Sequence, residues 1–356
     1  MSDEKKFYKI DNSEKTLKAS VEERIQEVNE VENDVTIIEK DINAYEVENQ
    51  FIVTSSPHVF SNSTTRKIML DVLIALLPAT IVSVIFFGIP ALILVLACTL
   101  SAVLFEWGFQ KICKRPNTIG DLSAAVTGLL LALNLSTAVP WWQGVIGSLI
   151  AIVVVKGLFG GLGKNFANPA ITARIIMLLA FGATVTASAH PIIGDVVSGA
   201  TPLPLIKEGS DKLPSLLNMF LGINGGAIGE TSALALLIGG LYLIIKRVIS
   251  WHTPVVYIAT VFLLTLLVGK DVEFALYHIL AGGLFIGAFF MATDYATTPS
   301  RPWGKVIFAF GCGLITVAIR LWGNYPEGVS FSILFMNLLT PYIEKWVQKR
   351  PFGGAR

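Results

Sequence analysis

The sequence predicts an all-α protein that crosses a membrane many times, with about ten transmembrane helices in two inverted five-helix repeats. Composition is the first reason: the 356 residues are 53% hydrophobic and only 15% charged, whereas soluble domains contain about 25% charged residues. The second reason is a series of apolar segments, several of which have the roughly 20 residues that a membrane helix needs. A recurring offset between the two halves of the chain is the third.

The N-terminal part has a different composition. Residues 1–50 contain 14 of the 26 acidic residues and 7 of the 27 basic residues. We therefore expect residues 1–57 to form an acidic, flexible cytoplasmic extension, and residues 58–350 to form the membrane domain. The first apolar segment begins at Ile68, after a charged stretch too long for a secretory signal peptide.

Ten apolar segments follow in order. They predict helices at residues 67–88, 90–107, 120–136, 142–158, 169–188, 229–245, 254–269, 274–291, 305–320 and 329–346. Repeat one then covers about residues 66–190 and repeat two about 229–347, with an outer loop at 189–228. With the N-terminus inside, the inner segments contain sixteen Lys and Arg residues and the outer segments four. This bias predicts that both termini are cytoplasmic.

The repeat is indicated by three pairs of matching segments. Pro90 and Pro254 each open a helix, the segments 133–140 and 292–299 each close one, and Lys156 and Arg320 each precede a glycine-containing turn. The offsets are close to 160–164 residues. Five helices per repeat require the second copy to be inverted, and inverted repeats hold their sites near midplane, often at broken helices.

The outer loop contains a distinctive stretch, Asp195 to Pro202. Gly199 and Ala200 are small, and Pro202 biases Thr201 away from helix. The flanking Pro and Gly residues predict a loop that displays the Thr201 hydroxyl. One interpretation is a plain connecting turn, and the other is a functional threonine.

Two further segments carry candidate cofactor contacts. In the glycine-rich run 157–170, bare amides around Gly163 and Asn165 can cradle a phosphate or a flavin edge, or simply form a tight turn before the N-cap Asn168. Arg174 follows one turn into the next helix as an intramembrane ionisable residue. In the run 225–233, we expect Glu230, followed by Thr231, to lie in the first turn of a helix, as a capping charge or a cofactor contact.

Three aspartates are candidates for an ion path. Asp294 ends a long apolar run close to Pro299, which suggests a broken helix and an expected cationic or hydrogen-bonding partner. Asp121 and Asp71 are similar but weaker cases, and each is alternatively a solvated helix end.

Metal and nucleic-acid sites are not predicted. Cys98, Cys113 and Cys312 have no CxxC spacing and no nearby His, and two of them lie in apolar runs as small core residues. A cluster shared with a partner through Cys113 stays open. Basic residues are scattered in short loops rather than gathered on one face.

Four motifs together resemble one family. They are Ser198-Gly199-Ala200-Thr201, the run 229–233, the run 163–170 and Ala-Thr-Asp-Tyr at 292–295. Residues 58–350 resemble the D subunits of the Rnf complex, the membrane-bound ion-translocating ferredoxin:NAD oxidoreductase, and the homologous B subunit of the sodium-pumping NADH:quinone reductase. The closing Ser232-Ala233 and the total length favour the Rnf subunit.

The resemblance implies a flavoprotein that is not catalytic alone. FMN would be joined to Thr201 by a phosphoester, added on the outer face by a flavin transferase that recognises Asp195, Ser198, Gly199 and Ala200. Its phosphate would be held by amides of the run 225–231, and riboflavin is a second, non-covalent cofactor. The expected cofactor contacts are Thr201, Asp195, Ser198, Gly199, Ala200, Glu230, Thr231, Gly163, Asn165, Asn168 and Arg174.

The resemblance also implies partners and location. We expect a bacterial inner-membrane protein embedded in lipid, working with a second flavin-bearing subunit and with iron–sulfur subunits that supply the NAD and ferredoxin sites. The implied fold is shared with urea- and ammonium-type channels. A permease of that fold without covalent flavin, with Asp294, Asp121 and Glu230 along a path, and a structural anchor are the alternatives, and Thr201 discriminates between them.

Overall fold

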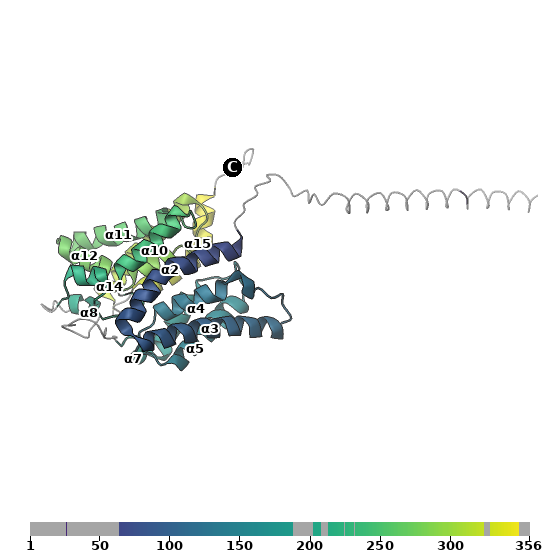
Figure 1. The fold of residues 1–356 in the computed structure, drawn as a ribbon. Coiled ribbons are helices and arrows are strands. Elements are labelled where there is room, and N and C mark those ends of the chain that lie inside the picture. Colours follow the sequence, from purple (N-terminus) through teal and green to yellow (C-terminus); the bar gives the residue numbers. More distant parts are fainter. Residues whose placement is uncertain are drawn as a thin grey trace, which may run out of the picture. The chain divides into compact units, whose positions relative to one another are not determined.

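The computed structural model describes residues 64–187, 202–207, 213–223, 225–230, 232–323 and 328–348, together with Gln26. Contacts divide the chain into two compact units, Met1–Asn62 and Ser63–Arg356. All the described residues except Gln26 belong to the second unit, and the fold below is that of this unit alone. Its described segments are built from helices (Figure 1).

The helices follow the predicted order. The first half contains α2 (Thr65–Phe87), α3 (Ile89–Ile112), the 3₁₀ turn η1 (Ile119–Asp121), α4 (Ser123–Leu133), α5 (Trp141–Leu149), the π-helix η2 (Ile150–Gly157), α6 (Pro169–Ala180) and α7 (Gly182–Val185). The second half contains α8 (Pro202–Lys207), α9 (Leu216–Leu221), α10 (Ala233–Ile245), α11 (His252–Gly269), α12 (Val272–Leu280), α13 (Leu284–Ile286), the π-helix η3 (Gly287–Met291), α14 (Pro302–Trp322) and α15 (Val329–Val347). Every predicted apolar segment overlaps at least one of these helices.

Helix length limits how many of these segments are membrane spans. Among the described residues, α2, α3, α11 and α14 are long and apolar enough to cross a membrane. The pair formed by α12 and residues Leu284–Met291 makes a fifth candidate, bent by 65° at its break. The chain is therefore a polytopic, all-helical membrane protein. Ten crossings and the inverted repeat remain predictions, since α4 has only 11 residues.

Side-chain caps fix where several helices begin. The Asn168 carboxamide accepts hydrogen bonds from the Ala170 and Ile171 amides, and Pro169 occupies the first turn of α6, as predicted. The Ser232 hydroxyl accepts from the Ala235 amide at the start of α10. These caps satisfy backbone donors that have no partner inside the helix.

The predicted outer loop contains two short helices, α8 and α9. The expectation of a loop throughout was therefore wrong at residues 202–207. Pro202 and Pro204 are both compatible with helix here because they lie in its first turn, where a missing amide hydrogen breaks no intrahelical bond.

Exposed side chains along the long helices are apolar. Leu77 and Ile81 of α2 are 50% and 56% exposed, and Leu100 and Leu104 of α3 are 60% and 63% exposed. Such faces suit a lipid environment, in which hydrocarbon replaces water around the helix.

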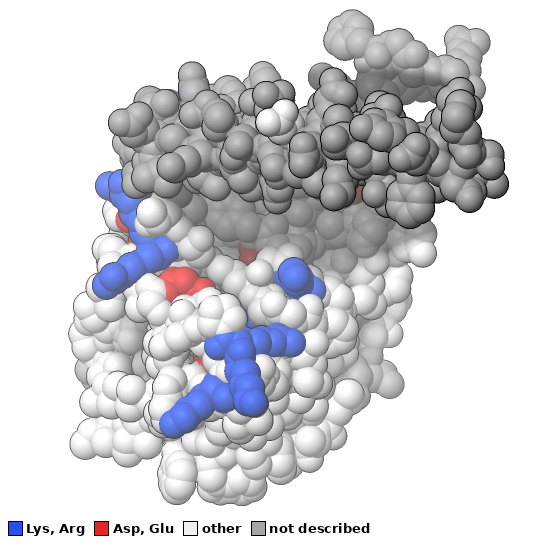
Figure 2. All heavy atoms as spheres, turned by 90° about the vertical axis from the view of Figure 1, so that its right-hand side faces the viewer, with Lys and Arg blue, Asp and Glu red and all other residues white. Residues whose placement is uncertain are grey.

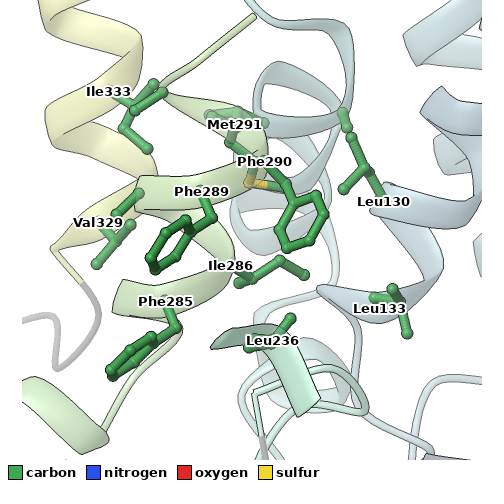
Figure 3. Close-up of a cluster of buried hydrophobic side chains, with 14 of the residues drawn as sticks. Leu130, Leu133, Leu236, Phe285, Ile286, Phe289, Phe290, Met291, Val329 and Ile333 are labelled. Atoms are coloured by element: carbon green, nitrogen blue, oxygen red, sulfur yellow. The ribbon is translucent and has the colours of Figure 1, made fainter. Parts of the chain in front are cut away.

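Both halves contribute to the buried core. Figure 3 shows Phe285, Phe289 and their neighbours on α13 and η3 between side chains of other helices. The labelled neighbours are Leu130 and Leu133 of α4, Leu236 of α10, and Val329 and Ile333 of α15. Side chains of α13 and η3, in the second half, therefore share one buried core with side chains of α4, in the first half.

Glycines allow two of the close helix crossings. A Cβ on Gly239 of α10 would overlap the backbone carbonyl of Ala75 in α2. A Cβ on Gly128 of α4 would lie 2.7 Å from the Cys98 carbonyl oxygen of α3. Small residues let membrane helices approach closely enough for dispersion contacts to hold them together.

Candidate functional site

Two cavities lie near the start of α4 and the end of η2 and have Lys156 and Leu162 in common. The first, called the asparagine cavity, has a volume of about 80 Å³. Its polar lining residues are Ser123, Thr127, Lys156, Asn165, Asn168, Thr293, Asp294 and Tyr295. The second, called the glutamate cavity, has a volume of about 250 Å³. Its polar lining residues include Glu106, Gln110, Arg115, Thr118, Asp121 and Lys156.

The asparagine cavity is bounded by residues from both halves of the chain. Asn168 caps α6 with its carboxamide oxygen, and its Nδ2 donates to the Met291 carbonyl oxygen at 3.4 Å. The amide of Asn337 lies 3.2 Å from the Asn168 backbone nitrogen and 3.2 Å from the Thr297 carbonyl oxygen. Asn168 therefore connects the start of α6 to the end of η3, and it is the N-cap of α6, as predicted.

Asn165 differs from Asn168 in having an unused polar atom. The residue is 8% exposed, and its Oδ1 is buried without a hydrogen-bond partner. The turn before it contains Gly160, Gly161 and Gly163, all with positive φ, which glycine adopts without strain. An orphaned acceptor beside a cavity costs free energy unless a ligand or water donates to it.

The glutamate cavity contains a buried ion pair. Lys156 Nζ lies 2.7 Å from Glu106 Oε1, and the two side chains are 3% and 6% exposed. Gln110 Nε2 donates to the same Glu106 oxygen at 3.3 Å. Glu106 Oε2 is buried without a partner among the described residues.

Asp121 is connected to this ion pair through Ser123. Asp121 Oδ1 accepts from the Ser123 amide at 2.8 Å and from the Ser123 hydroxyl at 2.6 Å. Lys156 Nζ lies 2.6 Å from the same hydroxyl oxygen. Asp121 thus fixes the start of α4, and it also belongs to a continuous polar chain from Asp121 to Glu106.

Arg174 and Glu230 were predicted separately and lie together. Arg174 Nη2 is 3.4 Å from Glu230 Oε1, and both residues are buried. The same guanidinium donates to the Asn134 carbonyl oxygen at 2.9 Å and to the Ser330 hydroxyl at 2.6 Å. Arg174 therefore joins the end of α4, the start of α15 and the segment before α10.

The predicted position of Glu230 in a first helical turn was wrong. α10 begins at Ala233 with Ser232 as its N-cap, and no acidic residue lies in its first turn. Glu230 instead packs against Gly283, where a Cβ would lie 2.5 Å from its Oε1. Its carboxylate therefore meets the Arg174 guanidinium rather than the positive end of the α10 dipole.

Asp294 lies in the turn after η3, outside the helices that can cross a membrane. Its carboxylate accepts from the Ala296 amide at 3.4 Å and from the Thr297 hydroxyl at 3.2 Å. Burial raises the pKa of Asp294 above its usual value, and these two hydrogen bonds oppose that rise. The break predicted for this helix is present, but it lies between α12 and α13 rather than at Asp294.

Asp71 and the cysteines lie away from both cavities. Asp71 Oδ1 accepts from the Tyr242 hydroxyl at 2.9 Å, which links α2 to α10. Cys98 and Cys312 are fully buried, as predicted, and Cys113 is exposed. The described part of the chain contains no group of three or more His, Cys, Asp or Glu residues arranged to bind a metal.

Several predicted site residues lie outside the described residues. They are Asp195, Ser198, Gly199, Ala200, Thr201 and Thr231. Gly163 is described, and a Cβ there would meet nothing within 4 Å. The attachment of a flavin to Thr201 therefore stays a prediction.

Sequence reasoning missed the pair Glu106 and Lys156. The signal was available, because Glu106 interrupts the apolar run Val103–Phe109, and intramembrane carboxylates usually have a partner. It also missed the role of Arg320, which is 3% exposed. Its guanidinium donates to the carbonyl oxygens of His278, Ala281 and Gly282, and so satisfies the end of α12 at the break.

Comparison with known proteins identifies the family. The model of the NQR2, RnfD, RnfE family matches residues 52–353. The D subunit of the Na⁺-translocating ferredoxin:NAD⁺ oxidoreductase complex of Acetobacterium woodii is 51% identical over 307 residues, covering 85% of this chain and 96% of the relative. The D subunit of the proton-translocating ferredoxin:NAD⁺ oxidoreductase complex of Clostridium ljungdahlii is 43% identical over 325 residues, covering 86% and 98%.

A more distant relative agrees with these two. The D subunit of the ion-translocating oxidoreductase complex of Halorhodospira halophila is 36% identical over 343 residues, covering 85% of this chain and 96% of the relative. The resemblance recognised from the four sequence motifs is thereby confirmed. The chain belongs to the NQR2, RnfD, RnfE family, in which its relatives are D subunits of ion-translocating oxidoreductase complexes.

Proposed function

We propose that the chain is the membrane-embedded electron-transfer subunit of an ion-translocating ferredoxin:NAD oxidoreductase complex, and that it is not catalytic alone. The observation that carries this proposal is 51% identity with the Acetobacterium woodii protein over nearly its whole length. Family membership and four or five membrane-spanning candidates support it. The ferredoxin and NAD sites then belong to partner subunits, including iron–sulfur subunits.

The finer part of the proposal concerns FMN on Thr201. The motif Ser198-Gly199-Ala200-Thr201 and the upstream Asp195 support a phosphoester to the Thr201 hydroxyl, added by a flavin transferase. When bound, the flavin supplies the capacity to accept and release electrons. A second flavin-bearing subunit on the outer side would be the electron donor.

The asparagine cavity supports a second, non-covalent flavin. The orphaned Asn165 Oδ1 suits a ring N–H donor, and Phe289 and Phe290 give the cavity an apolar wall. A volume of about 80 Å³ is smaller than the roughly 300–1,000 Å³ of pockets that hold drug-sized ligands. Binding of riboflavin therefore requires these walls to move apart, while Asn165 fixes the orientation of the ring.

Ion coupling is proposed at the polar groups around Lys156. Asp294 lines the asparagine cavity, Asp121 lines the glutamate cavity, and Lys156 lines both. Asp71 lines neither, which makes it the weakest of the three predicted path residues. The relatives differ in the ion that their names give, Na⁺ in one and protons in another, so the proposal includes either ion.

The inverted repeat is retained as the proposed architecture. Lys156 and Arg320, which match in the predicted repeat, are both buried basic residues, and each contacts the place where a short helix begins. Lys156 contacts Ser123 at the start of α4, and Arg320 contacts Ala281 and Gly282 before α13. Equivalent contacts at matching positions support two copies of one structural unit in a multi-pass protein of the inner membrane, with both termini cytoplasmic.

A denaturing gel viewed under ultraviolet light tests the flavin attachment. The chain is co-expressed with an active flavin transferase, beside Thr201→Ala and the control Ser210→Ala, which removes another hydroxyl from the same loop. We expect fluorescent bands for the wild type and Ser210→Ala and a dark band for Thr201→Ala. A dark wild-type band, with the transferase active on a control substrate, favours the permease instead.

A further inference from the structure

A third cavity lies where α10 ends and where α11 and α14 begin. It has a volume of about 660 Å³ and is called the cationic cavity. The residues that carry the argument are Arg247, Ser250, Trp251, Tyr295, Ser300 and Lys305. It adjoins the asparagine cavity, with which it shares Val248, Ile249, Thr293 and Tyr295, but none of the residues predicted from the sequence to bind flavin or to form the ion path lines it.

The charged residues known to line the cationic cavity are both basic. Arg247 and Lys305 line it, and no Asp or Glu among the described residues does. Two carboxylates lie at its edge without pairing with either cation: Glu344 Oε1 accepts from the amide of the lining residue Ser300 at 2.7 Å, and Asp294 accepts from Ala296 and Thr297. Two cations that form no ion pair among the described residues favour an anionic ligand.

Neither cation has a side-chain partner in the described residues. The side chains of Arg247 and Lys305 make no ion pair and no hydrogen bond there. Arg247 also has a φ of 57°, a left-handed conformation that is uncommon for residues other than glycine. The exposed Arg247 guanidinium, beside the cavity, can donate two hydrogen bonds to the oxygens of a phosphate group.

Two helix N-termini add to the positive potential. α11 has Trp251 as its N-cap and α14 has Arg301, and neither helix has a side-chain hydrogen bond at its cap. Residues at both starts line the cavity. The unsatisfied amides and the helix dipoles favour a negative group between the two starts.

The surroundings favour a lipid as the source of the anion. Ile245 at the end of α10 is 78% exposed, and Trp303 on α14 is 73% exposed. Trp251, which lines the cavity, is 54% exposed. Exposed Trp beside apolar helix faces is typical of a membrane–water interface, where a headgroup lies at the cavity and acyl chains lie along the helices.

The wider surface has a matching character. Figure 2 shows the side of the domain at which α2 begins, where Lys and Arg side chains lie as separate patches with few acidic side chains between them. The charge bias of the sequence predicts that this side faces the cytoplasm, where the leaflet contains anionic lipids.

We propose that the cationic cavity binds the phosphate headgroup of an anionic phospholipid. Arg247 and Lys305 neutralise the phosphate, and Ser250 and Tyr295 belong to the same lining, with the Tyr295 hydroxyl donating to the Val248 carbonyl oxygen. The fold thereby anchors the turn 292–300, which carries Asp294, to the lipid surface.

Binding of a fluorescent phosphatidylglycerol to the purified full chain, in micelles of neutral detergent, tests this proposal. The test variant is Arg247→Gln/Lys305→Gln. The matched control is Lys111→Gln/Lys246→Gln, which removes the same charge at two lysines that lie over the rings of Trp107 and Tyr242. Melting curves in phosphatidylcholine establish that each variant is folded, and Arg247→Lys is a second, conservative variant.

We expect the wild type and the control to prefer phosphatidylglycerol over phosphatidylcholine. The test variant should bind phosphatidylglycerol about thirtyfold more weakly, because each of the two cations contributes about a five- to sixfold change in affinity. Arg247→Lys should retain most of the binding, because the positive charge remains.

Three results would overturn the proposal. Equal binding of the two lipids, or equal losses in the test and control variants, would show that the cavity does not select the headgroup. Displacement of the fluorescent lipid by millimolar glycerol phosphate or inorganic phosphate would identify a soluble phosphate compound as the ligand. In the assembled complex, cross-linking of Lys305 to an acidic segment of a partner subunit, with no lipid effect, would assign the cavity to that partner.

Discussion

Lys156 Nζ lies 2.7 Å from Glu106 Oε1, and both side chains are almost completely buried between α3, α4 and η2. Such a pair does not raise stability above that of a well-packed apolar pair, because both charges lose their hydration. Its position at the junction of two cavities gives it another use: Lys156 lines both the cavity that contains Asp294 and the cavity that contains Asp121.

Removal of one member of this pair is expected to be strongly destabilising. Lys156→Met or Glu106→Gln leaves a buried partner without its counterpart, at a cost of about 3–5 kcal/mol. The double variant should lose less than the sum of the two, because no uncompensated charge remains. Thermal unfolding of the purified chain measures this, with the exposed Lys111→Met as control. Strict additivity of the two single effects would mean that the pair is not coupled.

The stability of the protein is expected to require the guanidinium group of Arg174 and not only a positive charge at this position. It binds Asn134, Ser330 and Glu230 at once, which an ammonium group cannot reproduce in the same geometry. Arg174→Lys should therefore lower the unfolding temperature, and Ser330→Ala should cost about 1.5–3 kcal/mol through one charge-assisted bond. Arg66→Lys at the exposed start of α2 is the control. An unchanged melting temperature for Arg174→Lys would contradict this account.

Gly239 and Gly108 provide a matched pair of helix glycines. A Cβ at Gly239 overlaps the Ala75 carbonyl, whereas a Cβ at Gly108 meets nothing within 4 Å. Gly239→Ala should separate α2 from α10 and destabilise the protein. Gly108→Ala should be neutral or stabilising by up to about 1 kcal/mol, because alanine has the higher helix propensity. Melting temperatures of the two variants check this, and the reverse order would show that the α2–α10 crossing is looser than described.

Asn165 should affect the non-covalent flavin without affecting the covalent one. Asn165→Ala removes the orphaned acceptor from the asparagine cavity, so riboflavin extracted by acid should fall while the fluorescent gel band at Thr201 remains. Gln110→Ala, in the glutamate cavity, is the control and should retain riboflavin. Full riboflavin content in Asn165→Ala would exclude this residue from the cofactor site.

Asp294 should make stability depend on pH. Burial raises its pKa in the folded protein above the usual 3.8, so the folded state binds the proton more tightly than the unfolded state. Its stabilising contribution is therefore present below pH 3.8 and is lost as pH rises through the folded pKa. The melting temperature of Asp294→Asn relative to wild type should rise over that interval. If the melting temperature of Asp294→Asn relative to wild type instead falls as pH increases, folding lowers the pKa of Asp294 rather than raising it.

The sequence alone determined the class of the protein, the order of its helices and its family. Apolar segments can be read directly from the sequence, and each of the ten predicted segments overlaps a helix of the structure. The four motifs were sufficient to recognise the family that the comparisons confirm. The N-cap at Asn168 was also predictable, because a cap depends only on neighbouring residues.

The tertiary structure alone decided which charges meet. Arg174 and Glu230 are 56 positions apart, and Lys156 and Glu106 are 50 apart, so no local pattern predicts either pair. Glu230 was assigned to a helix dipole because the sequence could not show the distant guanidinium that binds it. Burial removes water from these groups, and the partner that replaces water is set by packing between helices rather than by the segment that carries the charge.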